Sequence, residues 1–418
     1  MTDDVERRQL RSELAHWRAA ITQLTDLDSV APPEAWAQLE DYLRLRLRTR
    51  LLSSVAALDA EGAVLATRID SGDPIAATRS ALLRLRQRYL AVEVTVEWFG
   101  DSVQQRTTPR LGAVLRGLDT IAVDAMEVLL RPLGIEVPPV LTYPDKGLGA
   151  AVLKAGINLW DRGGISPVAA IKITRHNLAS PLAITHESTH QVAALTGWNP
   201  QLAEVLRATV APTSADLAEQ WASWASELAA DVGQFVLTGW SSVPALANVV
   251  DGTTAQVHRI RPGDPHPPAW LRILFNVELC RTWFGPDGPW TDLAATWRAR
   301  HDPRELPGAD AAVAAASVAV LPQLAAACTR HAFPAFGGRP ISALADPRRV
   351  SPPALAQLAR DAGDSLTTST FLARNDSLRI LALMTSEMSL DPTAAADQAR
   401  RLHDWLARLA PLPLPRAA

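Results

Sequence analysis

The chain has 418 residues, of which 48% are hydrophobic and 20% are charged, and its formal net charge is −3 at pH 7. This composition is typical of a globular protein with a sizeable core, and it excludes a mainly disordered chain. Because the net charge is small and negative, no overall positive field exists to hold nucleic acid or an anionic membrane. We therefore expect no nucleic-acid partner.

The N-terminal residues, the most apolar stretch and the cysteines indicate the cellular location of the protein. Residues 1–8 contain no apolar run, so no secretory signal peptide is predicted. The most apolar stretch, residues 311–321, is shorter than the roughly 20 residues that cross a bilayer, which predicts no membrane span. The two cysteines, Cys280 and Cys328, form no CxxC pair and suit a reducing compartment. These features predict a cytoplasmic location.

Residues 1–137 are predicted to form a helical N-terminal region. Leu43, Leu47 and Leu51 recur at every fourth position among arginines, which predicts one apolar helical stripe. Prolines and a glycine between positions 132 and 139 mark the end of this region.

The central region, residues 138–300, mixes strands and helices. Strands are predicted at 140–143 and at 168–175, the second half-exposed because its apolar residues alternate with polar ones. A helix from about 182 to 195 follows, ending at Gly197, and a second helix is predicted from about 216 to 237. Residues 301–418 are again predicted to be helical. The fold class is therefore mainly α with a small central β-sheet.

The most informative motif is His186-Glu187-Ser188-Thr189-His190, an HExxH sequence inside the first of these helices. A spacing of four residues puts both imidazoles on one helix face, where they can reach a single metal ion. Glu187 lies about 100° around the helix, so its carboxylate can meet a water on the metal rather than the metal itself. An accidental match is expected in fewer than about one such chain in a hundred. The alternative is that the two histidines only cap or pack a core helix.

A third protein ligand has to come from another part of the chain. Ala193 and Thr196 occupy the positions of the Gly and His in the HExxHxxGxxH pattern, which excludes that class. A glutamate on a following helix is the other common solution. Three glutamates lie between the motif and residue 260, and only one of them has an aspartate four residues later; the three are Glu204, Glu219 and Glu227.

Glu227 and Asp231 lie on one helical face at this spacing. Glu227 can bind the metal, and Asp231 can accept a hydrogen bond from the outer nitrogen of a ligand histidine. The alternative is a like-charge pair on a solvated face. Trp224, Leu228 and neighbouring apolar residues favour a buried helix, in which two unpaired acids are costly.

HExxH followed by ExxxD resembles the gluzincin metallopeptidases, the thermolysin-like group. The resemblance covers roughly residues 140–285 and implies a zincin-like catalytic core. It implies Zn²⁺ held by His186, His190 and Glu227, with Glu187 as general base and Asp231 orienting a ligand. It also implies that an edge strand, here residues 168–175, pairs with an extended peptide substrate.

Further along, the segment from Asp264 to Arg272 looks like the HPP…R element of CAAX-prenyl-protease-like gluzincins. We expect His266 to act in catalysis by donating a hydrogen bond to the tetrahedral oxyanion, and Arg272 to brace an acid or bind substrate. The alternative is a Pro-rich turn whose arginine caps a helix. Two further substrate-binding candidates are Asn177, which is otherwise a loop-capping residue, and Tyr143.

The sequence thus predicts a zinc metallopeptidase acting on a peptide or protein substrate. Two alternatives remain at this stage. One is a helical scaffold or partner-binding protein that keeps a structural or regulatory zinc site. The other is a zinc hydrolase of non-peptide amides. A structural site has no use for Glu187, which favours an enzyme.

Overall fold

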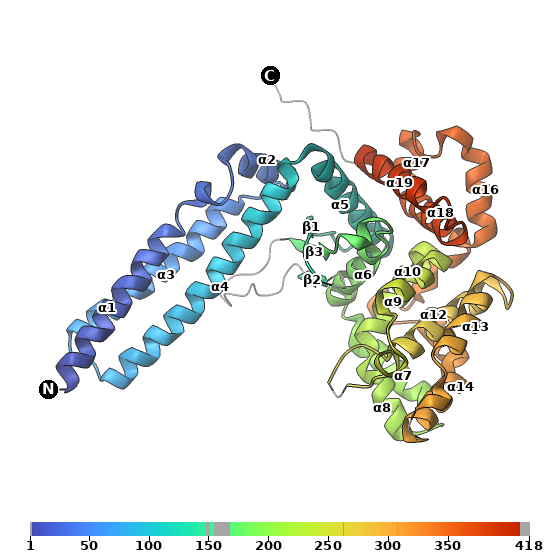
Figure 1. Cartoon of the computed structure of the whole chain (residues 1–418), viewed down its shortest axis with the longest axis horizontal. Coiled ribbons are helices and arrows are strands. Elements are labelled where there is room, and N and C mark those ends of the chain that lie inside the picture. Colours follow the sequence, from blue (N-terminus) through green and yellow to red (C-terminus); the bar gives the residue numbers. More distant parts are fainter. Residues whose placement is uncertain (1, 148–150, 154–167, 262, 307, 410–418) are drawn as a thin grey trace. The chain divides into compact units, whose positions relative to one another are not determined.

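The computed structural model describes residues 2–147, 151–153, 168–261, 263–306 and 308–409 (Figure 1). The described chain is mainly helical with one small sheet, which confirms the predicted fold class. It divides into two compact units, Met1–Ala113 and Val114–Lys154 with Ala169–Pro411. The first unit is therefore shorter than the predicted N-terminal region. The C-terminal helices belong to the same unit as the sheet.

The first unit is built from α1 (Thr2–Gln23), α2 (Pro33–Leu43), α3 (Leu47–Asp70) and α4 (Ile75–Thr107), and its three long helices lie side by side (Figure 1). The predicted leucine stripe does not belong to a single helix. Arg44 adopts the left-handed conformation with φ of 55°, which ends α2, and α3 begins at Leu47. Leu43, Leu47 and Leu51 are nevertheless all buried.

The second unit contains the sheet, whose strands are β1 (Val140–Pro144), β2 (Ala151–Leu153) and β3 (Ala169–Ile173) in the order β1-β3-β2. β3 pairs parallel with β1 and antiparallel with β2. The prediction that residues 168–175 form a half-exposed edge strand is therefore wrong. β3 is the central strand, and four of its five residues are buried, because the sheet is covered rather than solvated on one face.

The helices of the second unit surround α9, which is buried along almost its whole length. Its packing partners include α6, α7, α10, α12 and α18. The predicted helix at 216–237 is two helices, since the chain turns at Trp224 between α8 and α9. The helices of this unit, with their bounds, are α5 (Pro109–Leu130, from Val114 onward), α6 (Ala183–Thr196), α7 (Trp198–Val210), α8 (Ala215–Ser223), α9 (Ala225–Thr238), α10 (Ser242–Val250), α11 (Thr254–Val257), α12 (Ala269–Phe284), α13 (Pro289–Arg300), α14 (Gly308–Arg330), α15 (Ile341–Leu344), α16 (Pro352–Ala362), α17 (Thr370–Asn375), α18 (Ser377–Leu390) and α19 (Ala395–Leu409).

One helix in the described part of the chain has the length and hydropathy of a membrane span. It covers Ala311–Arg330 of α14, with a mean hydropathy of 1.8 over its most apolar window, of which 39% is buried. The apolar segment is thus longer than the sequence pattern indicated. α14 packs against α12 and α7, as a core helix does. The absence of a membrane span stays a prediction.

Candidate metal centre

Helix α6 carries the HExxH motif and forms where it is predicted, following β3 and a short turn. It ends at Gly197, whose φ of 68° is a left-handed conformation that a glycine adopts without strain. His186 and His190 lie one turn apart, with ring centroids 4.9 Å from each other. Both are buried, at 9% and 8% relative exposure, so their imidazoles face the interior rather than solvent.

Helix α9 supplies Glu227 in its first turn and Asp231 one turn later. Its close approach to α6 depends on Gly233. A Cβ atom on Gly233 would lie 2.2 Å from Cγ2 of Thr189 in α6, so only a glycine allows the two helices this separation. Because α9 packs closely on α6 at Gly233, Glu227 and Asp231 lie against the two histidines.

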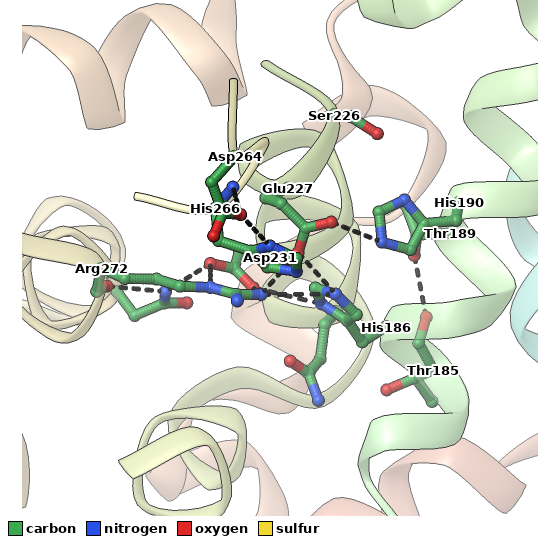
Figure 2. A network of polar contacts seen from close by, with 12 residues as sticks. Thr185, His186, Thr189, His190, Ser226, Glu227, Asp231, Asp264, His266 and Arg272 are labelled. Atoms are coloured by element: carbon green, nitrogen blue, oxygen red, sulfur yellow. Dashed lines mark hydrogen bonds and ion pairs between the residues drawn. The ribbon is translucent and has the colours of Figure 1, made fainter. Parts of the chain in front are cut away.

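The two helices form one ligand cluster (Figure 2). Glu227 Oε2 lies 3.4 Å from His186 Nε2, and Glu227 Oε1 lies 3.3 Å from His190 Nε2. One donor atom from each of the three residues lies within 4.8 Å of the other two, and this is the only such group found among the described residues. The three residues that the sequence pattern selected as ligands are therefore brought together.

Asp231 contacts Nδ1 of His186, which is the contact that the sequence predicted between Asp231 and one of the two histidines. Its Oδ1 lies 3.1 Å from His186 Nδ1, and its side chain is fully buried. A carboxylate in this place fixes the His186 tautomer and leaves Nε2 directed at Glu227. His190 has no equivalent contact, because its Nδ1 is buried without a hydrogen-bond partner in the described part of the chain.

Arg272 of α12 enters the cluster from the side opposite α6 (Figure 2). Its Nε and Nη2 donate to the two carboxylate oxygens of Asp231, both at 2.7 Å, and Nη2 also lies 3.2 Å from Glu227 Oε2 and 3.3 Å from His186 Nε2. Of the two roles expected for Arg272, the geometry is that of bracing an acid. Asn276, one turn further along α12, adds a hydrogen bond from Nδ2 to Asp231 Oδ2 at 3.1 Å.

These contacts set the charges of the cluster. Burial alone would raise the pKa of Glu227, but the two histidines and Arg272 outweigh it and hold this pKa well below its usual range. Burial of Asp231 is likewise outweighed by Arg272 and His186, and its pKa is lowered to about 2. Both carboxylates thus stay ionised beside the Arg272 guanidinium and the two imidazoles.

Glu187 differs from the other two acids of the site. It is buried at 6% relative exposure, yet it forms no hydrogen bond or ion pair with any described residue. Burial raises its pKa above the usual value, and the histidine charges oppose this effect. A buried carboxylate that is not engaged by the protein is free to accept a proton from a bound molecule.

His266 lies at the exposed side of the cluster, in the loop before α12. Its Nε2 is 3.4 Å from Glu227 Oε2, and its side chain is 54% exposed. Its Nδ1 lies 2.6 Å from Asp264 Oδ1, and Asp264 also accepts a hydrogen bond from the His266 backbone amide at 3.0 Å. The imidazole is therefore held with Nε2 directed toward the ligand atoms.

The remaining substrate-binding candidates are placed less specifically. Asn177 lies in the turn after β3, and its Nδ2 is buried without a hydrogen-bond partner in the described residues. Tyr143 lies on β1 in register with Lys172 of β3. Both roles stay predictions. The two rejected glutamates, Glu204 and Glu219, pair with Arg207 and are largely exposed, away from the cluster.

Asp264 and Asn276 are residues of the site to which the sequence pattern assigned no role. Asp264 lies two positions before His266, and their side chains can contact each other in a tight loop but not in an extended chain. Asn276 follows Arg272 by four residues, so helical periodicity places both on one face of α12. The spacing of Asn276 does not name its partner, because Asp231 lies more than forty positions earlier in the chain.

In comparisons with protein-family models, with curated proteins and with solved structures, nothing matches this chain.

Proposed function

We propose that this protein is a zinc metallopeptidase, in which His186, His190 and Glu227 hold the metal and Glu187 acts as general base. The observation that carries the proposal is the combination of a three-residue donor cluster with the buried carboxylate of Glu187 on the same helix as the two histidines. A structural metal site needs only the donors.

The donor set fits zinc. Two imidazoles and one carboxylate are the ligands of many catalytic zinc sites, and three protein ligands leave one position open. Tetrahedral coordination with bonds of about 2.0–2.1 Å separates neighbouring ligand atoms by about 3.3 Å. Each Glu227 oxygen faces one of the two Nε2 atoms, at 3.4 and 3.3 Å, and one donor atom from each of the three residues lies within 4.8 Å of the others. When bound, zinc would polarise a substrate carbonyl and lower the pKa of a water molecule.

The surrounding residues would supply proton transfer and orientation. Glu187 would accept the proton of the attacking water and pass it to the leaving amine, because burial raises the pKa of its carboxyl group. His266 would donate from Nε2 to the developing oxyanion, and Asp264 would hold the imidazole in that orientation. Asp231, braced by Arg272 and Asn276, would keep His186 directed at the metal.

The sheet favours a peptide over other amides as substrate. β1 is not a free edge at its centre, because the Thr142 backbone amide donates to Asp119 of α5 at 2.7 Å. β2 is the other outer strand and lies beside α6. We propose that an extended peptide would pair with β2 by backbone hydrogen bonds, which a non-peptide amide cannot form in the same way.

The test compares the full chain with Glu187→Gln, with His190→Ala, and with Glu219→Gln as a surface control. Zinc content and cleavage of a mixture of protein-derived peptides are measured by elemental analysis and mass spectrometry. We expect about one zinc per chain in wild type, in Glu187→Gln and in the control, and none in His190→Ala.

Hydrolysis should fall by ~10²–10⁴-fold in Glu187→Gln and remain unchanged in Glu219→Gln. Loss of zinc in Glu187→Gln would show that this residue is a ligand, against the assignment. Zinc in wild type without any peptide cleavage would instead favour a scaffold with a structural metal site.

A further inference from the structure

Helix α4 presents an apolar stripe to solvent on the side that faces away from α1 and α3. Leu83, Leu90 and Val94 are 49%, 42% and 47% exposed, whereas Leu82, Leu85 and Val92 are buried. Spacings of seven and four residues put the three exposed side chains on one side of the helix. Aligned aliphatic residues on a surface helix are a feature of helices that pair.

Polar residues share this side of the helix, with Arg86 and Gln87 exposed between Leu83 and Leu90, and charged residues of opposite sign lie at its two ends. Arg79 precedes the apolar residues on the same side of the helix, and Glu97 and Asp101 follow them. All three are exposed, and none forms an ion pair with another described residue. We call Arg79, Leu83, Arg86, Leu90, Val94, Glu97 and Asp101 together the α4 stripe.

We propose that the α4 stripe docks against the same stripe of a second copy of this chain, with the two helices antiparallel. A two-fold axis beside residues 88 and 89 places Leu83 of each copy opposite Val94 of the other. The same axis brings Arg79 of each copy next to Glu97 and Asp101 of the other. A parallel pairing would instead oppose Arg79 to Arg79 and Glu97 to Glu97.

The occupant is a second copy because the stripe is complementary to itself. An isologous interface has to match its own surface after a two-fold rotation, and a stripe whose basic residues, Arg79 and Arg86, lie in its first half and whose acidic residues lie at its other end does so. The stripe is about 33 Å long at 1.5 Å per residue, so the contact area is at the low end for specific interfaces. A weak, concentration-dependent dimer is expected.

The first test is sedimentation equilibrium of the full 45.1 kDa chain over a range of concentrations. The average mass should rise toward that of a dimer as concentration increases, and the rise should be smaller at high salt. Leu90→Asp should abolish it. Val64→Asp is the matched control, because Val64 is an exposed aliphatic residue of α3 outside the stripe, and it should change nothing. A monomer at every concentration would overturn the proposal.

Charge reversal tests the pairing at the ends. Arg79→Glu and Glu97→Arg should each raise the dissociation constant about tenfold, because the two-fold axis repeats each contact. The variant with both reversals should dimerise more tightly than either single variant, since the contact between positions 79 and 97 is restored while Asp101 stays acidic. Additive weakening in the double variant would refute this pairing.

Disulfide cross-linking tests the orientation. In the antiparallel dimer, Leu83 of one copy and Leu83 of the other are separated by about 16 Å along the helix axis. Leu83→Cys alone and Val94→Cys alone should therefore not cross-link, whereas a mixture of the two should. The native Cys280 and Cys328 are buried and should not interfere. Cross-linking of each variant with itself, and not in the mixture, would indicate a parallel pair and contradict the proposal.

Discussion

Asp124 of α5 provides a pH-dependent test of the second unit that does not involve the metal centre. Its carboxylate lies in the wall of a cavity of about 380 Å³ and accepts a hydrogen bond from Ser377, the first residue of α18. Burial, with a smaller contribution from the charge of Glu127, raises the pKa of Asp124 to about 6 from 3.8. We expect Asp124→Asn to stabilise the protein at neutral pH.

The size and sign of this effect follow from linkage. A shift of about 2 pKa units corresponds to about 3 kcal/mol at about 1.4 kcal/mol per unit. Between pH 3.8 and about 6, the folded protein retains a proton at Asp124 that the unfolded chain has lost, so the stability contribution of Asp124 falls as pH rises. It is fully present below pH 3.8 and lost above about pH 6.

The assay is urea unfolding of wild type and Asp124→Asn from about pH 4 to about pH 7. As the pH rises across this range, the unfolding free energy of Asp124→Asn should increase by about 3 kcal/mol relative to that of wild type. Glu127→Gln should reduce the pH dependence, and Ser377→Ala should increase it, because the hydroxyl favours the charged form. A difference between wild type and Asp124→Asn that does not change with pH would refute the argument.

Two further predictions concern the metal centre. Gly233→Ala should destabilise the second unit by about 1–3 kcal/mol and weaken zinc binding, because the added Cβ would lie 2.2 Å from Thr189. Adding Thr189→Ala should partly restore the stability, measured by thermal unfolding, and the zinc affinity, measured by titration. Glu227→Gln should weaken zinc binding severely and Asp231→Asn by about 10–100-fold, whereas Glu204→Gln should leave the titration unchanged; a larger effect of Glu204→Gln than of Glu227→Gln would contradict the ligand set.

The parts of the site that could be predicted from the sequence depend on short spacings. His186 and His190 share a face because a helix repeats every 3.6 residues, and the same rule applies to Glu227 and Asp231. The choice of Glu227 over Glu204 and Glu219 also needed only neighbouring residues, since apolar side chains around it indicate burial. The mainly helical fold class and the two longer strands follow from the same local periodicity.

The tertiary structure decided what joins distant segments. The order β1-β3-β2 places β3 in the centre of the sheet, although its apolar pattern by itself is compatible with an edge strand. Arg272 acquires Asp231 as its partner, and His266 lies over Glu227, only because α12 and its preceding loop fold back onto α9. Local periodicity determines which side chains share a face, but the partner of that face depends on packing between elements far apart in the chain, and no short spacing encodes it.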